Sequence, residues 1–160
     1  MQKNRYSNKE RNYLQSVIFQ LNECIDAFNT LNEINKIHEN ILASKPNKSF
    51  LIDRSLIVPL VGIVRDSFCI RLTYLFDKRK DVHSLKKYFK FKEIDNLYNQ
   101  PVTKDSIKAR NGNIAHLGKK YIKWPSVETI LSSNIQIMLN DIKIKIMFPL
   151  PEDKGDTLSK

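Results

Sequence analysis

The sequence has 160 residues, 41% hydrophobic and 28% charged, which fits one folded domain, is short for two, and argues against general disorder. Only 4 Gly and 6 Pro are present, too few for a turn-rich β-sandwich or barrel, so the composition favours helices. The net charge of +10 favours a polyanionic partner, nucleic acid first and an anionic membrane surface second.

Localisation signals in the sequence favour the cytoplasm. The stretch MQKNRYSNKERNY is polar and charged, unlike a secretory signal peptide. The longest apolar run, SLIVPLVGIV at 55–64, is too short to span a bilayer. Cys24 and Cys69 lie in apolar helical surroundings without a CxxC motif, so we expect buried free thiols in a reducing compartment. We therefore expect a cytoplasmic protein with no membrane partner.

Two long helices are predicted in the first half of the chain. Over residues 7–43, apolar residues recur at steps of three and four, the period of an amphipathic helix. The SKPNKS segment at 44–49 ends it, because Pro and Asn favour a turn. A second helix is expected over about 50–76. It is apolar around much of its circumference, as a central core helix would be, and Pro59 should kink it or mark its early turns.

The second half predicts shorter elements. Residues 77–101 are basic and aromatic, and we expect short helices or an irregular crossover there. After Pro101, Thr103 is the expected N-cap of a further helix. A last helix should start at Pro125 and continue through Ile142.

Together these elements predict an all-α bundle of about four or five helices with a long N-terminal helix. Its connections should be short, except for the basic crossover. We expect a single domain over residues 1–148, followed by a flexible C-terminal tail at 149–160.

The stretch KARNGNIAHLGKK, residues 108–120, carries unusual polar residues in this helical pattern. On a helix at 100° per residue, Arg110, Asn113 and His116 form a polar stripe beside the apolar positions. Arg110 to His116 spans about 9 Å along the axis, so guanidinium and imidazole can approach the same small anion. Arg provides a planar fork for phosphate, and His provides a proton donor or acceptor near neutral pH. Asn113 could orient either side chain.

Gly112 bears on how this stretch folds. A helix-interior Gly costs roughly 1 kcal/mol relative to Ala, which a chain tolerates where a partner helix or a substrate passes close to the backbone. The alternative is a tight turn at Asn111-Gly112. The helix is favoured because the flanking residues do not alternate between apolar and polar, and because Ile107 and Ile114 are seven residues apart, which is a helical spacing. A plain solvated helix face is a further alternative that periodicity leaves open.

The segment Arg110-Asn111-Gly-Asn-Ile-Ala-His116 resembles the Arg-x4–6-His signature of the HEPN superfamily, with its polar residue directly after the Arg. Its IAHLG ending resembles the abortive-infection (AbiU-type) branch. The resemblance implies a HEPN-like helical bundle. It also implies a metal-independent, cofactor-free endoribonuclease that acts as a toxin or phage-defence effector. The implied assembly is a homodimer in which motif helices face each other across a cleft.

The same resemblance assigns roles to residues. Arg110 would hold and neutralise the scissile phosphate of RNA. His116 would transfer protons as the ribose 2′-OH attacks, leaving a 2′,3′-cyclic phosphate. Asn111 would position the phosphate or support His116. HEPN toxins with nucleotidyltransferase antitoxins carry a Tyr two residues after the His, where this sequence has Gly118. An antitoxin protein remains a candidate partner. Control of activity by nucleotide transfer from the antitoxin onto such a Tyr does not fit this sequence.

Other charged residues are weaker candidates for binding substrate. Charges that interrupt the most apolar helix should be paired or face the cleft, which makes Arg65 and Arg71 candidates. The basic run over 78–92 interleaves with Phe89 and Phe91, either as a backbone-binding patch with base stacking or as a solvated loop whose aromatic side chains cap the core. No histidine has metal-ligand spacing with a carboxylate, so we expect no metal site. The candidate site residues are Arg110, Asn111 and His116 for catalysis, and Asn113, Arg71, Arg65, Lys86 and Lys87 for substrate binding.

A different class of function stays open beside the nuclease. The same fold without catalysis would be an RNA- or nucleotide-binding module that uses the basic surface, or a protein-interaction module. The first would bind RNA in a salt-sensitive manner without cleaving it.

Overall fold

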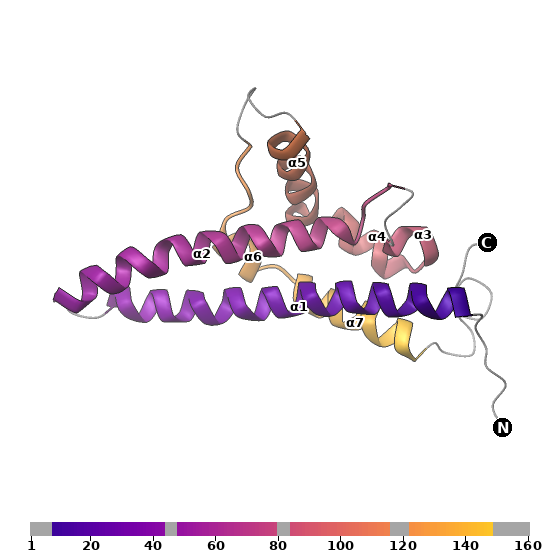
Figure 1. Ribbon diagram of the computed structural model, residues 1–160, viewed down its shortest axis with the longest axis horizontal. Helices are drawn as coiled ribbons and strands as arrows, with labels where there is room; N and C mark the ends of the chain where they lie inside the picture. The colour runs from indigo at the N-terminus through magenta and orange to yellow at the C-terminus, as the bar shows by residue number, and fades with distance from the viewer. Residues whose placement is uncertain (1–7, 44–47, 80–83, 116–121, 149–160) are drawn as a thin grey trace.

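The computed structural model describes residues 8–43, 48–79, 84–115 and 122–148, without the side chains of 48–54 and 114–115. All regular elements in these ranges are helices, as the sequence predicts (Figure 1). They are α1 (Asn8–Ala43), α2 (Lys48–Tyr74), α3 (Leu85–Tyr88), α4 (Lys92–Asn99), α5 (Pro101–Ala115), α6 (Val127–Leu131) and α7 (Ile135–Met147).

Helices α1 and α2 form a long antiparallel pair that is the frame of the molecule (Figure 1). The predicted helices over 7–43 and 50–76 are both confirmed within two residues at each end. The core-facing stripe of α1 keeps steps of three and four because these positions fall on one side of a 3.6-residue turn. Its buried members are Val17, Leu21, Cys24, Ile25, Phe28 and Leu31.

Only the C-terminal half of α2 is a core helix. Phe68 and Leu72 are fully buried there, as is Leu75 directly after the helix, whereas Leu56 and Ile63 are 69% and 66% exposed. The prediction of a central core helix is therefore wrong for the first half. The reason is that the α1–α2 pair extends beyond the other helices at that end (Figure 1). Pro59 lies inside α2 and does not end it.

The basic crossover folds as the two short helices α3 and α4. Phe89 and Phe91 are buried, and their rings stack with centroids 5.6 Å apart. They belong to the hydrophobic core, so the structure favours the aromatic side chains as a cap on the core and leaves them unable to stack on bases.

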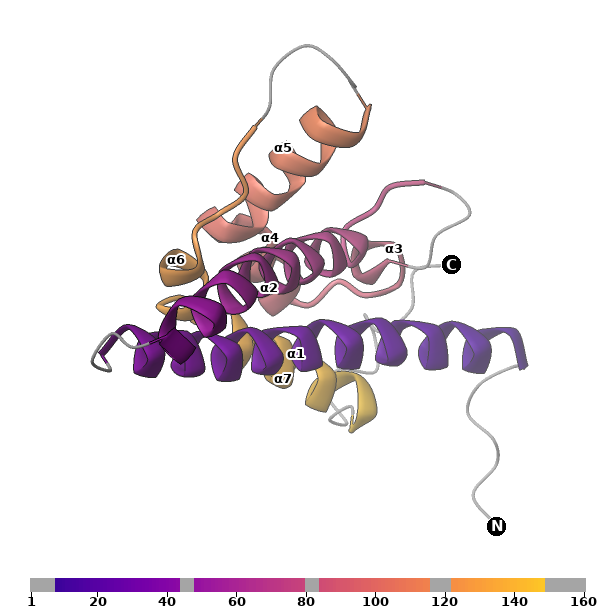
Figure 2. The ribbon, with the colours of Figure 1, turned by 60° about the vertical axis from the view of Figure 1, so that its left-hand side comes forward.

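Helix α5 begins at Pro101, two residues before the predicted start, so Thr103 is not its N-cap. The Lys104 amide already donates to the Gln100 carbonyl at 3.0 Å, which makes Gln100 the capping position. Pro suits the first helical position because its φ is fixed and that position needs no N–H donor. Helix α5 packs on α2 and α4 and projects away from the α1–α2 pair (Figure 2).

The predicted last helix is divided into α6 and α7 by a turn at residues 132–134, so the prediction of one helix is wrong. The Ser126 hydroxyl caps α6 by accepting from the Thr129 amide at 3.1 Å. At the other end, the Ser133 hydroxyl donates to the Ile130 carbonyl at 2.6 Å. Such side-chain bonds to the backbone compete with helix continuation. Together with the two short helices of the crossover, this break gives seven helices in the described ranges where four or five were expected.

One hydrophobic core joins these helices, with Ile135, Leu139 and Ile142 of α7 fully buried against the rest. Trp124 is partly buried against this core. The predicted tail at 149–160 lies outside the described residues.

Candidate functional site

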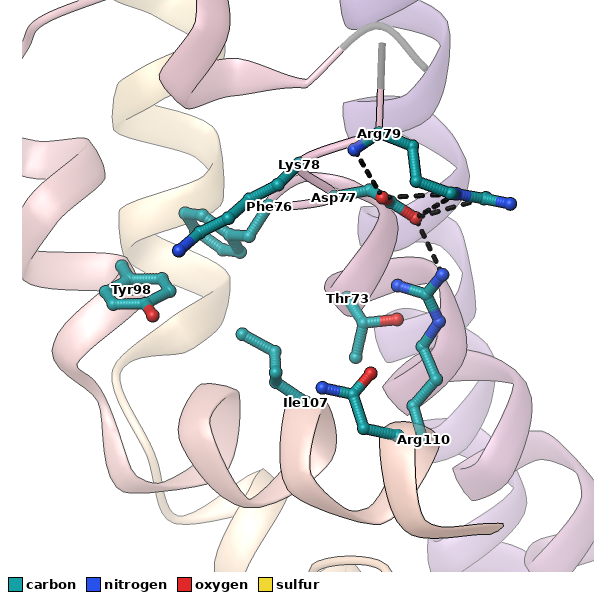
Figure 3. Close-up of a pocket in the computed structure, with 9 residues that line it drawn as sticks. Thr73, Phe76, Asp77, Lys78, Arg79, Tyr98, Ile107 and Arg110 are labelled. Carbon is teal, nitrogen blue, oxygen red and sulfur yellow. Dashed lines mark hydrogen bonds and ion pairs between the residues drawn. The ribbon is translucent and has the colours of Figure 1, made fainter. Parts of the chain in front are cut away.

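Arg110 projects from α5 toward the end of α2 and pairs with Asp77 (Figure 3). Its Nη2 lies 2.6 Å from Asp77 Oδ2, and its guanidinium carbon lies 5.2 Å from the centre of the Tyr74 ring. The side chains of Arg110 and Asp77 are only 19% and 5% exposed. Arg110 is therefore held in a fixed place and is not a freely solvated surface charge.

Asp77 is the centre of a small charge network just after α2. Its carboxylate accepts from the backbone amide of Arg79 at 3.0 Å and from the Arg79 guanidinium at 3.1 Å. Burial pushes the pKa of Asp77 upward. The hydrogen bonds from the Arg79 amide and from the two guanidinium groups of Arg110 and Arg79 outweigh that effect and lower the pKa to about 2. The carboxylate is thus ionised at neutral pH.

A cavity of about 580 Å³ opens beside this network. Figure 3 shows Phe76 and Tyr98 on one side of it and the linked side chains of Arg79, Asp77 and Arg110 on the other. The residues that line it come from α2, the segment after it, α4 and α5: Thr73, Phe76, Asp77, Lys78, Arg79, Tyr98, Ile107, Arg110 and Asn111. Two of the three predicted catalytic residues, Arg110 and Asn111, therefore share one cavity.

His116, the third predicted catalytic residue, lies outside the described residues, one position beyond the end of α5. Its distance to Arg110 stays a prediction from helical spacing. His83 is outside them too, whereas His38 is half-buried on α1.

Asn113 and Gly112 make contact with the returning chain. The Asn113 side-chain amide donates to the Ile122 carbonyl and accepts from the Ile122 amide, both at 2.8 Å. A Cβ on Gly112 would lie 2.3 Å from Ile122 Cδ1. The close approach expected at Gly112 is therefore made by a side chain of the same molecule, and the alternative of a turn at Asn111-Gly112 is wrong because both residues are inside α5. Asn113 ties two segments together and does not line the cavity.

The two α2 arginines that were predicted to bind substrate, Arg65 and Arg71, are paired away from the cavity. Arg65 contacts the neighbouring Asp66 at 2.7 Å, and Arg71 pairs with Glu23 of α1. Arg71 lies about 160° around the helix from Thr73, which lines the cavity. Of the two alternatives for these charges, the structure favours pairing over a place in the cleft.

The two lysines of α3 differ in their position. Lys86 lies 2.9 Å from Asp95 and 4.0 Å from the centre of the Tyr98 ring, so it contacts a residue that lines the cavity without lining the cavity itself. Lys87 lies over Tyr88, at 5.4 Å from the ring centre, and does not line the cavity.

Both cysteines are buried and free, as the sequence predicts. Burial raises the pKa of both thiols, that of Cys69 to about 11, so neither is a reactive thiolate at neutral pH. Among the described residues, no three His, Cys, Asp or Glu side chains gather as metal ligands. In the same ranges, no helix combines the length and the apolar character needed to cross a bilayer.

The sequence pattern did not identify Asp77 and Tyr98 as residues of the site. Asp77 lies 33 residues before Arg110, and nothing in the basic run around it marks it as the partner. One signal was present, because Thr73 and Asp77 are four residues apart at the end of α2 and just after it, and Ile107 and Arg110 lie one turn apart on α5. Comparisons with models of protein families, with curated proteins and with solved structures find no match to this chain.

Proposed function

We propose that this protein is a metal-independent endoribonuclease of the HEPN type that cuts RNA by attack of the ribose 2′-OH and acts as a toxin or phage-defence effector. One observation carries the proposal. Arg110, the first residue of the Arg-x5-His motif, is held by a nearly buried carboxylate beside a cavity. An arginine on a plain solvated helix face would have no such fixed position.

The chemistry follows from the residue types. A guanidinium has five N–H donors, and the bond to Asp77 uses one of them, so others remain for phosphate oxygens. The 2′-oxygen forms a bond to phosphorus as the bond to the 5′-oxygen breaks. His116 makes one of the two proton transfers, from the 2′-OH or to the leaving 5′-oxygen, and water makes the other. Arg110 balances the charge that develops on the phosphate, and Asn111 adds an amide in the same cavity.

An exposed apolar face on α2 supports the homodimer. Leu56, Leu60 and Ile63 are all exposed and follow one side of the helix at steps of four and three. Tyr74 comes about five helical turns after Leu56 and so lies on the same side, where it contacts Arg110. A second copy that covers this face would bring the Arg110 side chains of two protomers toward a shared cleft. An apolar face of this kind is typical of an interaction surface.

The decisive test is cleavage of labelled RNA in EDTA by the wild type, His116→Ala and Arg110→Lys, with His38→Ala as the control. We expect the wild type and the control to leave 2′,3′-cyclic ends. His116→Ala should lower the rate by about 100-fold or more, since general acid–base catalysis contributes that much. Arg110→Lys keeps the charge but loses the planar fork, and it should also lower the rate. Circular dichroism checks that the variants fold.

A non-catalytic RNA-binding module is the second candidate. It is favoured by the basic side chains that line the cavity, Lys78, Arg79 and Arg110, because they could hold a phosphate backbone without His116. Wild-type protein that binds several RNAs in a salt-sensitive manner and leaves all of them intact would reject the nuclease in favour of this module. A protein-interaction module would neither cleave nor bind RNA.

A further inference from the structure

The cavity beside Arg110 has two chemically different halves. On one side, Phe76 packs against Tyr98 with ring centroids 5.3 Å apart, and Ile107 adds an aliphatic side chain. On the other side, Arg79 and Arg110 provide two cations against the single carboxylate of Asp77, while the Lys78 side chain extends toward Phe76 and Tyr98. Figure 3 shows Phe76 and Tyr98 facing this charged side across the cavity.

This combination fits a nucleotide unit. A base has flat apolar faces that pack on aromatic side chains, and its phosphate is an anion that Arg and Lys bind. A volume of about 580 Å³ lies within the usual range for small-molecule sites and exceeds what a phosphate alone would need.

We infer that this cavity is a base-binding subsite that takes one unpaired base of the RNA strand while Arg110 holds the neighbouring phosphate. The inference rests on the proposed function and deepens it, because it restricts the substrate to single-stranded RNA. A paired base stays stacked in its helix, and it cannot enter the cavity unless the duplex opens at a cost of a few kcal/mol.

Polar groups are present for the edge of the base. The Thr73 hydroxyl donates to the Ile70 carbonyl at 2.7 Å, so its oxygen can still accept a hydrogen bond. The Asn111 amide lines the same cavity and offers both a donor and an acceptor. Asn111 is exposed and can hydrogen-bond the edge of a base that contacts Tyr98, whereas Thr73 is buried and adds a polar atom only to the wall of the cavity.

The position of Tyr98 is set before any ligand arrives. Phe76 supports its ring on one side, and the Lys86 ammonium lies 4.0 Å from its centre. Lys86 is in turn held by Asp95 at 2.9 Å. An ordered aromatic ring binds a base with little loss of conformational entropy.

The test is binding of two labelled oligonucleotides of equal length and charge, one with bases and one fully abasic. Both carry 2′-O-methyl sugars, which removes the attacking hydroxyl and prevents cleavage. The proteins are the wild type, Tyr98→Leu, which loses the ring, and Tyr98→Phe, which keeps it. Fluorescence anisotropy gives Kd at one fixed salt concentration.

We expect wild type and Tyr98→Phe to bind the strand with bases about tenfold tighter than the abasic strand, the gain typical of one stacked base. Tyr98→Leu should lose this preference and bind the abasic strand as wild type does. Equal binding of the two strands by the wild type would overturn the inference, because charge alone would then explain binding. Equal weakening of both strands by Tyr98→Leu would overturn it as well.

A cleavage assay separates this inference from the nuclease itself. The substrate is one RNA, free or annealed to its complement, and the free strand should be cut at least about tenfold faster. If the protein binds the strand with bases more tightly but cleaves no RNA, the base-binding subsite is retained and the nuclease is rejected. Cleavage of free and annealed RNA at the same rate would keep the nuclease and reject the subsite.

Discussion

The Asp77 carboxylate, which accepts hydrogen bonds from Arg79 and Arg110, gives the fold a dependence on pH. The pKa of Asp77 is about 2 in the folded protein, whereas the ordinary pKa of an Asp side chain is 3.8. A carboxyl whose pKa is lowered on folding stabilises the protein above its unfolded pKa. This contribution is lost as pH falls through the folded pKa. The shift corresponds to about 2 kcal/mol, a value supported by the low exposure of both side chains.

We therefore expect wild-type stability to fall by about 2 kcal/mol more than that of Asp77→Asn between about pH 5 and pH 2. Urea unfolding followed by circular dichroism at a series of pH values measures this difference. Asp105→Asn is the matched control, because Asp105 is an exposed carboxylate on α5. If Asp77→Asn and wild type lose stability in parallel over this range, the pairing carries no pH-dependent free energy.

At the scale of one element, α5 is fastened to the returning chain through Ile122. Asn113 makes two hydrogen bonds to the Ile122 backbone, and the Ile122 side chain lies against Gly112. These contacts fix the end of the helix that carries Arg110. They also explain why a residue of low helix propensity stands inside α5.

We expect Gly112→Ala to stabilise the protein by about 1 kcal/mol in an Ile122→Ala background, where the helix propensity of Ala is realised. In the wild-type background the new Cβ meets Ile122 Cδ1 at 2.3 Å, so the gain should be smaller or become a loss. Urea unfolding of the four proteins of this double-mutant cycle measures the coupling. An identical effect of Gly112→Ala in both backgrounds would contradict the close contact.

At the scale of the whole molecule, the exposed first half of α2 is the largest departure from a closed helical bundle. Leu56 and Ile63 are more than half exposed, although they continue the apolar pattern of a core helix. Sequence periodicity reports that a face is apolar, and it does not distinguish a core from an interface between two copies.

We expect Ile63→Glu to convert a dimer into a monomer and to lower RNA cleavage, because a charge would be buried in the interface. Analytical ultracentrifugation gives the mass. Phe19→Glu is the matched control, since Phe19 is 63% exposed on α1 and is not part of the α2 face. A monomeric wild type, or equal effects of the two variants, would rule out this face as the dimer interface.

Several features of the site could be predicted from particular residues. The steps of three and four over 7–43 and 50–76 located α1 and α2, and the step of seven from Ile107 to Ile114 placed Arg110 on a helix. The start of α5 and the break after α6 could not be predicted in this way. Both depend on which side chain or residue caps a backbone group, and several nearby polar residues are able to cap it.

The sequence by itself determined the helical class, the two long helices and the position of Arg110 on a helix, because these depend on local periodicity. Only the tertiary structure decided that Asp77 holds Arg110, that Asn113 binds the Ile122 backbone, and that Tyr98 faces the cavity. Those contacts join residues far apart in the chain. They depend on how α2, α4 and α5 pack, and helical spacing carries no information about that packing.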